Sequence, residues 1–404
     1  MSDISMRAMK VYPNRDTLDI ASKYFATRID WSYIKDTEFI NEVKKRGLSF
    51  QGTLNAITNV EKYALLKDNG TPRRDHFGRA GRYWANPNDS EYRLKHASAL
   101  AEWIHLGADS IQRDEPNAHG YWSENDTISF YSWLDGYIEG AAITPVPLST
   151  NLGSHGASFA EKGEILGSFF SFGMTEIDAR RLHPNWFWNA GLTAYKLNKI
   201  MVYTAGKRLT IDQYRKAIAL SYANGSLFIV PWDQFGGKGN PRVFIEHHHL
   251  ADLYGFIRSC ADLIDDYEPL GFEASETHWK ELRNNTGLKI KSKPEVSFFV
   301  RQKTKADKTS TVIHCISDSN TNYVDIVLNI RLNSDKEITA VNVYEANRYN
   351  EDTHVQAIAN KSYSSLHKKR KIPLVIEAES TARLSFQMET TWAIIEFPTN
   401  LEMQ

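Results

Sequence analysis

The sequence contains little cysteine: Cys260 and Cys315 are the only two among 404 residues. Two cysteines make neither a disulfide framework nor a zinc signature, so we expect two buried or surface thiols. No run approaches the roughly 18 apolar residues of a membrane-spanning helix, and the first residues lack the apolar core of a signal peptide. We therefore expect no membrane partner. The protein would be secreted or periplasmic if a signal segment has been removed, and otherwise cytoplasmic.

The sequence also lacks an excess of either charge, with 48 Lys and Arg against 49 Asp and Glu. A general nucleic-acid binder is usually basic, so no nucleic-acid partner is expected. The glycines at 236, 237 and 239 match no nucleotide-binding fingerprint. The run His247–His249 lacks the i, i+4 pair and nearby Glu that make a zinc site. We expect no metal and no cofactor.

Short apolar runs alternate with helical patterns over the first 270 residues, as in βαβ units that build a parallel sheet. We expect strands over Thr27–Tyr33, Leu48–Asn55, Arg82–Asn86, Ser110–Glu115, Val146–Asn151, Phe169–Glu176, Lys199–Thr204 and Ser226–Asp233. We expect helices over Asp36–Arg46, Ser90–Leu106, Glu124–Glu139, Asn185–Asn198, Thr210–Asn224 and His249–Tyr267. Eight strands in about 240 residues indicate an α/β fold, a (β/α)8 TIM barrel.

The pattern changes near Pro294. Seven short apolar segments follow, separated by polar turns and without helical periodicity, which predicts a small antiparallel β-sandwich. The segments are VSFFVRQ, STVIHCIS, YVDIVLNIRL, ITAVNVYE, KIPLVIEA, RLSFQME and TWAIIEF. We expect a catalytic barrel over 1–285 and an accessory β-domain over 290–404.

Polar and aromatic residues end nearly every predicted strand, which is where barrel enzymes carry their active sites. Amides bind sugar hydroxyls, and aromatic rings pack on the apolar faces of sugars. The predicted sugar-binding residues are Asp30, Trp31, Asn55, Arg74, His76, Trp84, Asn86, Gln112, His119, Asn151, Tyr203 and Trp232. This set indicates a polysaccharide or oligosaccharide substrate.

Glycoside cleavage needs two carboxylates on opposite sides of the scissile bond, so they should come from different strands. Side-chain alternation favours Asp114 over its neighbour Glu115 as the nucleophile. Glu176 ends an apolar strand, where desolvation favours a protonated acid, and we predict it as the general acid/base. Glu115 and Asp233 are the alternates.

Four loops that follow predicted strands carry twelve Lys and Arg against five Asp and Glu. Arginine offers forked donors that suit sulfate or carboxylate, so these loops favour an anionic glycan such as a sulfated fucan or galactan. The basic residues are Arg73, Arg74, His76, Arg79, Arg180, Arg181, His183, Lys207, Arg208, Lys238 and Arg242.

Three segments resemble barrel glycosidases. The stretch RYWANPNDSEYRLKHASALAEWIHLGADSIQRDEP is similar to their third and fourth strands, SYANGSLFIVPWD to their eighth strand, and TWAIIEF to the last strand of the β-domain that often follows. The chain departs from the largest clan, because strand 4 carries Asp-Glu and strand 7 carries no carboxylate. The strand 4 and strand 6 pair and the basic loops resemble the endo-fucanases of glycoside hydrolase family 168. That resemblance implies retaining cleavage of sulfated α-L-fucans.

Two alternatives remain open at this stage. A β-galactosidase or galactanase-type hydrolase would use Glu115 and Asp233. A catalytically inactive barrel would bind glycan through the same aromatic and basic residues. The sequence leaves the glycan identity, the linkage, endo or exo action and the oligomeric state undetermined.

Overall fold

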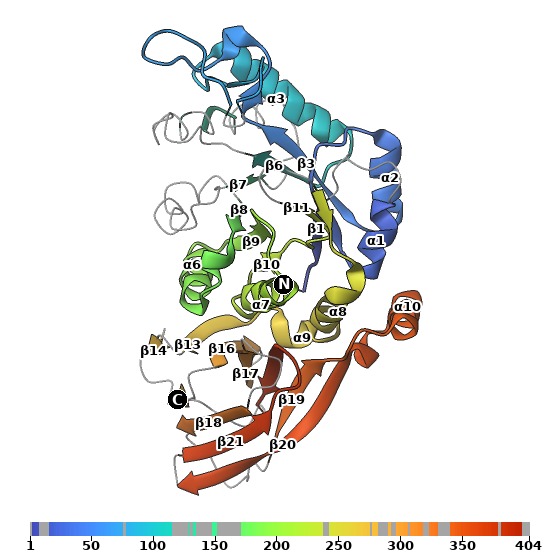
Figure 1. Cartoon of the computed structure of the whole chain (residues 1–404), viewed down its shortest axis with the longest axis vertical. Helices are drawn as coiled ribbons and strands as arrows, with labels where there is room; N and C mark the ends of the chain where they lie inside the picture. The colour runs from blue at the N-terminus through green and yellow to red at the C-terminus, as the bar shows by residue number, and fades with distance from the viewer. Residues whose placement is uncertain are drawn as a thin grey trace.

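The computed structural model describes 15 segments of the chain. These are 2–7, 16–75, 78–114, 129, 132–134, 148–151, 171–236, 242–274, 277–281, 290–291, 296–305, 308–317, 323–329, 340–378 and 381–397. Figure 1 shows two parts, with the antiparallel β-domain below the parallel-strand region. None of the described helices is long and apolar enough to cross a membrane.

Eight parallel strands form one sheet in the order β1-β2-β3-β6-β7-β8-β9-β10. They are β1 (Ser5–Arg7), β2 (Arg28–Ser32), β3 (Ser49–Asn55), β6 (Ser110–Asp114), β7 (Leu148–Asn151), β8 (Phe172–Ile177), β9 (Ile200–Ala205) and β10 (Leu227–Phe228). Val230, just after β10, bridges Met6 in parallel, and its N–H donates to the Ser5 carbonyl at 2.8 Å. The first strand therefore follows the last, and the sheet closes into the expected barrel.

Two of the expected barrel elements need correction. The run Arg82–Asn86 is not a barrel strand: β5 (Tyr83–Trp84) pairs antiparallel with β4 (Ile57–Thr58) in an insertion after β3. The eighth barrel strand is instead β1, which the sequence analysis missed. The expected count of eight was right because these two errors compensate.

Helices cover the outside of the barrel: α1 (Thr17–Lys23), α2 (Thr37–Lys45), α3 (Ser90–His105), α6 (Pro184–Lys196), α7 (Ile211–Ala223), α8 (Ala251–Ser259) and α9 (Ala261–Ile264). Side chains cap two of these helices: Asp89 accepts from the Tyr92 N–H at 2.8 Å, and Thr210 forms a capping box with Gln213. The helix expected over Glu124–Glu139 lies mostly outside the described residues. The one expected over His249–Tyr267 is divided into α8 and α9.

The barrel wall has an outward and an inward face. On the outside, the α3 ring of Trp103 lies flat on Gly52, where an added Cβ would meet the ring at 2.4 Å. On the inside, Gln112 of β6 reaches Met174 of β8 across the interior, with 3.7 Å between Nε2 and Sδ. Since side chains alternate along a strand, Asp114 and Glu176 face the same interior, nearer the carboxyl ends.

All seven segments expected to be β-strands after residue 290 are strands. The elements of this part are β13 (Glu268–Ala274), β14 (Thr277–Glu281), β15 (Ile290–Lys291), β16 (Val296–Lys305), β17 (Lys308–Ser317), β18 (Tyr323–Asn329), β19 (Ala340–Ala346), β20 (His367–Ala378), β21 (Thr381–Gln387) and β22 (Trp392–Glu396). They form one ten-stranded sheet, not the two sheets of a sandwich. Leu270 and Ile326 lie near opposite ends of the sheet yet share one buried cluster, so the sheet curls around it.

The other face of the curled sheet packs on the barrel. Trp392 is fully buried and meets Phe256 of α8 edge-on, with ring centroids 5.1 Å apart. Residues of β17, β19 and β22 belong to the same core cluster as the barrel strands. The β-domain therefore covers an apolar surface of the helical layer. The division expected at residues 285–290 stays a prediction, although β13 and β14 already pair within this sheet.

The expected absence of helices after residue 290 was wrong. Helix α10 (Glu351–Asn360) is capped by Asn350, whose side chain accepts from the Thr353 N–H at 2.9 Å. Its buried residues are His354 and Ala357, a spacing of one helical turn. Figure 1 shows α10 reaching from the β-domain toward the barrel helices α1 and α8.

Candidate active site

Asp114 occupies the carboxyl end of β6 and is 5% exposed. Its Oδ2 accepts from the Trp31 indole N–H at 3.1 Å and from the Tyr33 hydroxyl at 2.5 Å. Desolvation, and then the charge of Asp114, raise the pKa of Tyr33, so the phenol remains a proton donor. The Asp114 carboxylate is thus fixed in the barrel mouth by two donors from the end of β2, Trp31 within the strand and Tyr33 directly after it.

A backbone irregularity brings Trp31 to this position. The register between β2 and β3 shifts between Ile29 and Ser32, and Trp31 has a φ of +53°. A bulky residue rarely adopts this left-handed conformation, and such strain clusters at functional sites. The bulge turns the indole toward Asp114, which an unbroken strand would not allow because neighbouring side chains alternate.

Arg7, at the end of β1, is the central cation of the mouth. It is 4% exposed, and its guanidinium lies 4.6 Å from the centroid of the Trp31 ring. Burial lowers its pKa, as does Arg242, against the opposing attraction of Asp233, Glu176 and Asp114. The charges of three carboxylates, from β6, β8 and the segment after β10, therefore act on one buried arginine.

Asp233 and Trp232 are placed by the hairpin of β11 (Asp233–Phe235) and β12 (Arg242–Phe244). Arg7 donates to the Asp233 carbonyl at 3.1 Å, and Arg242 pairs with the Asp233 carboxylate at 3.2 Å. The Trp232 indole donates to the Arg7 carbonyl at 3.4 Å. Asp233 therefore pairs with a second arginine, Arg242, in addition to the contact of its carbonyl with Arg7.

Glu176 lies on β8, with one strand, β7, between it and the strand of Asp114. Neighbouring strands are about 4.8 Å apart, so the two carboxylates come from strands about 10 Å apart and both face the interior. Gly206, directly after β9, contacts the Glu176 side chain: a Cβ at Gly206 would lie 2.9 Å from Oε2 and 3.1 Å from the Glu176 Cβ. The Glu176 carboxyl group therefore fits beside β9 because residue 206 has no side chain.

Gly206→Ala is expected to lower kcat by about 10- to 100-fold, because a displacement of about 1 Å at a reacting group can cost that much. The fold should survive, since the added methyl group meets a flexible side chain. The measurement is kcat together with the melting temperature. Gly255→Ala is the matched control, because its Cβ would meet side-chain atoms of Leu366 and Phe25 at 3.2 Å, outside the mouth. Full activity of Gly206→Ala would contradict this role of the glycine.

Tyr33→Phe is expected to lower kcat by about tenfold or more, since a hydrogen bond to a charged group contributes about 1.5–3 kcal/mol. Trp31 still holds Asp114 in this variant, so activity should be reduced and not abolished. Tyr63→Phe is the control, because that hydroxyl also donates to a carboxylate, Glu91, at 3.2 Å, but on an exposed surface. Equal rates for the two variants would show that the Tyr33 contact is incidental.

The structure brings some of the other predicted residues toward the mouth. Asn55 donates to the Tyr33 hydroxyl at 3.4 Å and also accepts from the Ile57 N–H. Gln112 lies deeper in the interior, one inward position before Asp114. Asp30 is held inside the barrel, where its Oδ2 accepts from Ser5 Oγ at 2.6 Å and lies 2.7 Å from Arg28 Nε.

Four predicted sugar-binding residues lie elsewhere. Tyr203 is fully buried against α6, with its ring centroid 4.9 Å from that of Phe187. Trp84 forms a small core with Ala56 inside the insertion, and Asn86 accepts from the Asn88 N–H in a turn. Arg74 lines a groove of about 530 Å³ on the insertion.

The remaining predictions fall outside what the structure describes. Glu115, His76 and His119 are not among the described residues, and for Asn151 only the strand position in β7 is given. Arg7, Tyr33 and Gly206 were not predicted as site residues. Each directly follows or ends a barrel strand, and that position was the available signal.

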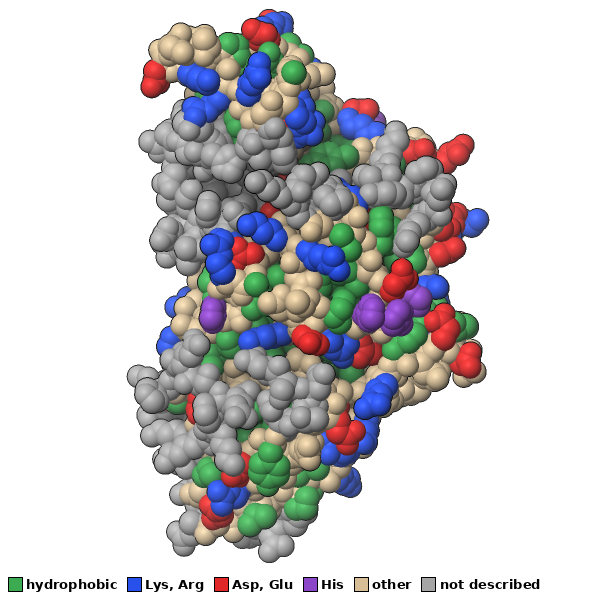
Figure 2. All heavy atoms as spheres, in the orientation of Figure 1, with side chains coloured by type: hydrophobic (Ala, Val, Ile, Leu, Met, Phe, Trp, Pro, Cys, Tyr) green, Lys and Arg blue, Asp and Glu red, His purple; other side chains and the backbone are tan. Residues whose placement is uncertain are grey.

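Several of the predicted basic residues are paired with acids. Arg79 pairs with Asp75 at 3.3 Å, and Arg180 pairs with Asp178 at 2.7 Å. On the face drawn in Figure 2, Lys and Arg lie among Asp and Glu and do not form one continuous basic surface. Among the described residues, basic side chains outnumber acidic ones in the groove on the insertion. Its lining contains Lys67, Arg73 and Arg74, with Glu61 as the acidic residue.

No protein-family model matches the sequence, and no curated protein matches it. Solved structures do match over nearly the whole chain. Amy13B of Eubacterium rectale has a TM-score of 0.56 at 10% identity, covering 98% of this chain and 96% of its own. CldA, a cyclomaltodextrin glucanotransferase with three domains, has a TM-score of 0.56 at 10% identity, covering 94% and 89%.

A third match is the trehalose-6-phosphate hydrolase of Bacillus licheniformis, with a TM-score of 0.52 at 12% identity, covering 98% of both chains. At such low identities the likeness shows the fold alone. The chain therefore shares its fold with these three proteins over nearly its whole length.

Proposed function

We propose that this protein is a glycoside hydrolase that acts by double displacement with Asp114 and Glu176. The observation that carries the proposal is the mouth itself. A buried carboxylate, Asp114, is fixed by two donors, and a second carboxylate, Glu176, comes from a different strand; the charges of both act on the buried Arg7. The fold likeness to carbohydrate-active barrels supports the same class of reaction.

In the first step, an oxygen of Asp114 attacks the anomeric carbon while the leaving glycosidic oxygen takes the proton of Glu176. The glycosidic bond breaks and an ester joins the sugar to Asp114. In the second step, Glu176 takes a proton from water, whose oxygen attacks the anomeric carbon and releases Asp114. The two steps restore both carboxyl groups and use only side chains and water.

Arg7 and Tyr33 support the chemistry without reacting. The Tyr33 and Trp31 donors hold one oxygen of Asp114, which orients the carboxylate toward the mouth. Arg7 places a fixed positive charge in a buried site, where charges act more strongly than in water. Arg7 covers one face of the Trp31 indole, so sugar stacking at this ring would use the opposite face.

The substrate class we propose is an anionic polysaccharide, such as a sulfated fucan or galactan. The support is the basic composition of the loops and the groove lined by Lys67, Arg73 and Arg74. Similarity to the endo-fucanases of glycoside hydrolase family 168 is the finer form of this proposal. The paired arginines of the other loops contribute less, because a paired guanidinium has already satisfied part of its charge.

The test is the release of reducing ends from sulfated fucans, carrageenans, agar, neutral galactans and α-glucans. Cleavage of a sulfated glycan, weakened by Arg73→Ala and Arg74→Ala, would support both parts of the proposal. Cleavage of a neutral glycan alone would keep the reaction and exclude the anionic substrate. Binding without cleavage of any polymer would favour the inactive carbohydrate-binding barrel.

A further inference from the structure

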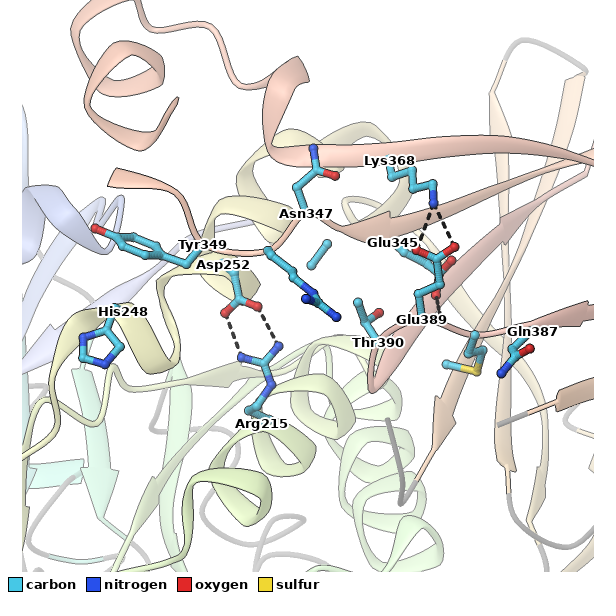
Figure 3. A pocket seen from close by; sticks show the side chains of 13 residues that line it. Arg215, His248, Asp252, Glu345, Asn347, Tyr349, Lys368, Gln387, Glu389 and Thr390 are labelled. Atoms are coloured by element: carbon cyan, nitrogen blue, oxygen red, sulfur yellow. Dashed lines mark hydrogen bonds and ion pairs between the residues drawn. The ribbon is translucent and has the colours of Figure 1, made fainter. Parts of the chain in front are cut away.

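A second hollow lies between the barrel helices and the β-domain, with about 860 Å³ of space. Figure 3 shows its side chains converging from α7, α8, the loop after β19, β20 and the turn before β22. None of these elements carries a residue of the barrel mouth. The Lys, Arg, Asp and Glu residues of its lining are Arg215, Asp252, Glu345, Arg348, Lys368 and Glu389.

The carboxylates of this hollow are already neutralised. Asp252 is paired with Arg215 through two contacts of 2.8 and 2.6 Å. Glu389 accepts from Lys368 at 2.8 and 2.9 Å. Glu345, which is 1% exposed, accepts from Arg370 and from the Glu389 N–H. The lining as a whole carries three Lys or Arg and three Asp or Glu.

This arrangement fits one class of ligand. Arg215 and Lys368 already pair with carboxylates and have little charge left for a strongly anionic ligand, and an apolar ligand would leave the polar lining without partners. A neutral polyhydroxyl ligand can donate to the neutralised carboxylates and accept from the guanidinium and amide groups. The volume lies within the range of about 300–1,000 Å³ that is usual for small-molecule sites.

We propose that this hollow, the interdomain site, binds a neutral oligosaccharide, apart from the barrel mouth. Gln387 supplies an amide to this lining, and Arg348 supplies a guanidinium whose charge also acts on Glu389. His248, of the consecutive histidines of η3 (His247–His249), also lines the hollow. Figure 2 shows a cluster of histidine side chains at mid-height of the molecule. Occupancy would tie the barrel helices to the β-domain, since both parts line the site.

The experiment is a calorimetric titration of the full chain carrying Glu176→Gln, with maltotriose, galactotriose and inorganic sulfate as separate probes. One or both trisaccharides should bind, and sulfate should not. Arg348→Ala and Gln387→Ala should each weaken trisaccharide binding by about tenfold, and the double variant should abolish it. Lys371→Ala, on the exposed surface of β20 outside the hollow, is the matched control and should change nothing.

Three results would overturn the inference: no trisaccharide binds, binding is unchanged in the double variant, or sulfate is the probe whose binding the double variant removes. Failure of the proposed function is distinguishable, because it appears as absent hydrolysis by wild type while the trisaccharide titration still responds to Arg348→Ala. Hydrolysis by the double variant should equal that of wild type on short substrates, since the mouth is untouched.

Discussion

Asp114→Asn and Glu176→Gln are each expected to lower kcat by at least about a thousandfold on the glycan that the wild type cleaves. Asp114→Asn removes the attacking oxygen, since an amide does not form the glycosyl ester. Glu176→Gln removes the proton donor of the first step and the base of the second, and general acid–base catalysis alone contributes about 10²–10⁴. The double variant should be little slower than either single one, because residues that act together are not additive.

Matched controls separate loss of chemistry from loss of fold. Asp109→Asn changes a carboxylate just before the opposite end of β6, where Asp109 accepts from the Phe50 N–H at 2.8 Å. Asp178→Asn changes one two residues beyond Glu176, where it pairs with Arg180. Both controls should stay within about threefold of wild type. Activity that persists in Asp114→Asn would move the nucleophile to Glu115 or Asp233.

Arg7→Met is expected to destabilise the protein by about 3–5 kcal/mol, because it leaves buried carboxylates without their shared cation. Arg7 is 4% exposed and is attracted by Asp233, Glu176 and Asp114. Methionine roughly preserves the volume, so the loss measures charge and hydrogen bonding and not a cavity. Urea unfolding gives the free energy, and activity should be lost together with the stability.

Two further variants define the role of this cation. Arg7→Lys keeps the charge but loses the planar group over Trp31, so it should fall between wild type and Arg7→Met. Arg46→Met is the surface control, because Arg46 pairs with Asp19 and Glu42 in the open and should cost less than about 1 kcal/mol. If Arg7→Met and Arg46→Met had the same midpoint of urea unfolding, the claim that Arg7 stabilises the buried carboxylates would be wrong.

The alternation of strands and helices was predictable because hydrophobic period and caps are local signals. Glycines that follow helices are one such signal: Gly47, Gly107 and Gly225 all have positive φ. Strand β1 was not recognised, since three residues carry too little periodicity to stand out. Its role as a barrel strand comes from pairing with β2 and bridging Val230, which are contacts distant in sequence.

The run Arg82–Asn86 shows the opposite error. Its aromatic composition suits a strand, and β5 is indeed extended. The β-propensity of a segment does not specify which strand it pairs with, however, and here the pairing strand is β4 in the insertion. Trp84 accordingly packs on Ala56 and does not line the mouth.

The candidate site was predictable to the extent that it follows strand ends. Asp114, Glu176 and Asp233 all lie near Arg7, as expected of residues at the carboxyl ends of barrel strands. The contacts that fix Asp114 were not predictable, because they depend on the bulge at Trp31. The role of Gly206 was not predictable either, because it depends on the contact with Glu176 of the neighbouring strand β8.

The most direct test of the central claim is to trap the glycosyl ester. The wild type would be incubated with a 2-deoxy-2-fluoro glycosyl fluoride of the sugar released in the glycan panel, digested, and mapped by tandem mass spectrometry. We predict one added glycosyl group on Asp114, absent in Asp114→Asn and retained in Asp178→Asn. A label on Glu115 or Asp233, or turnover of the glycan by a wild type that never acquires a label, would contradict the assignment of Asp114 as the nucleophile.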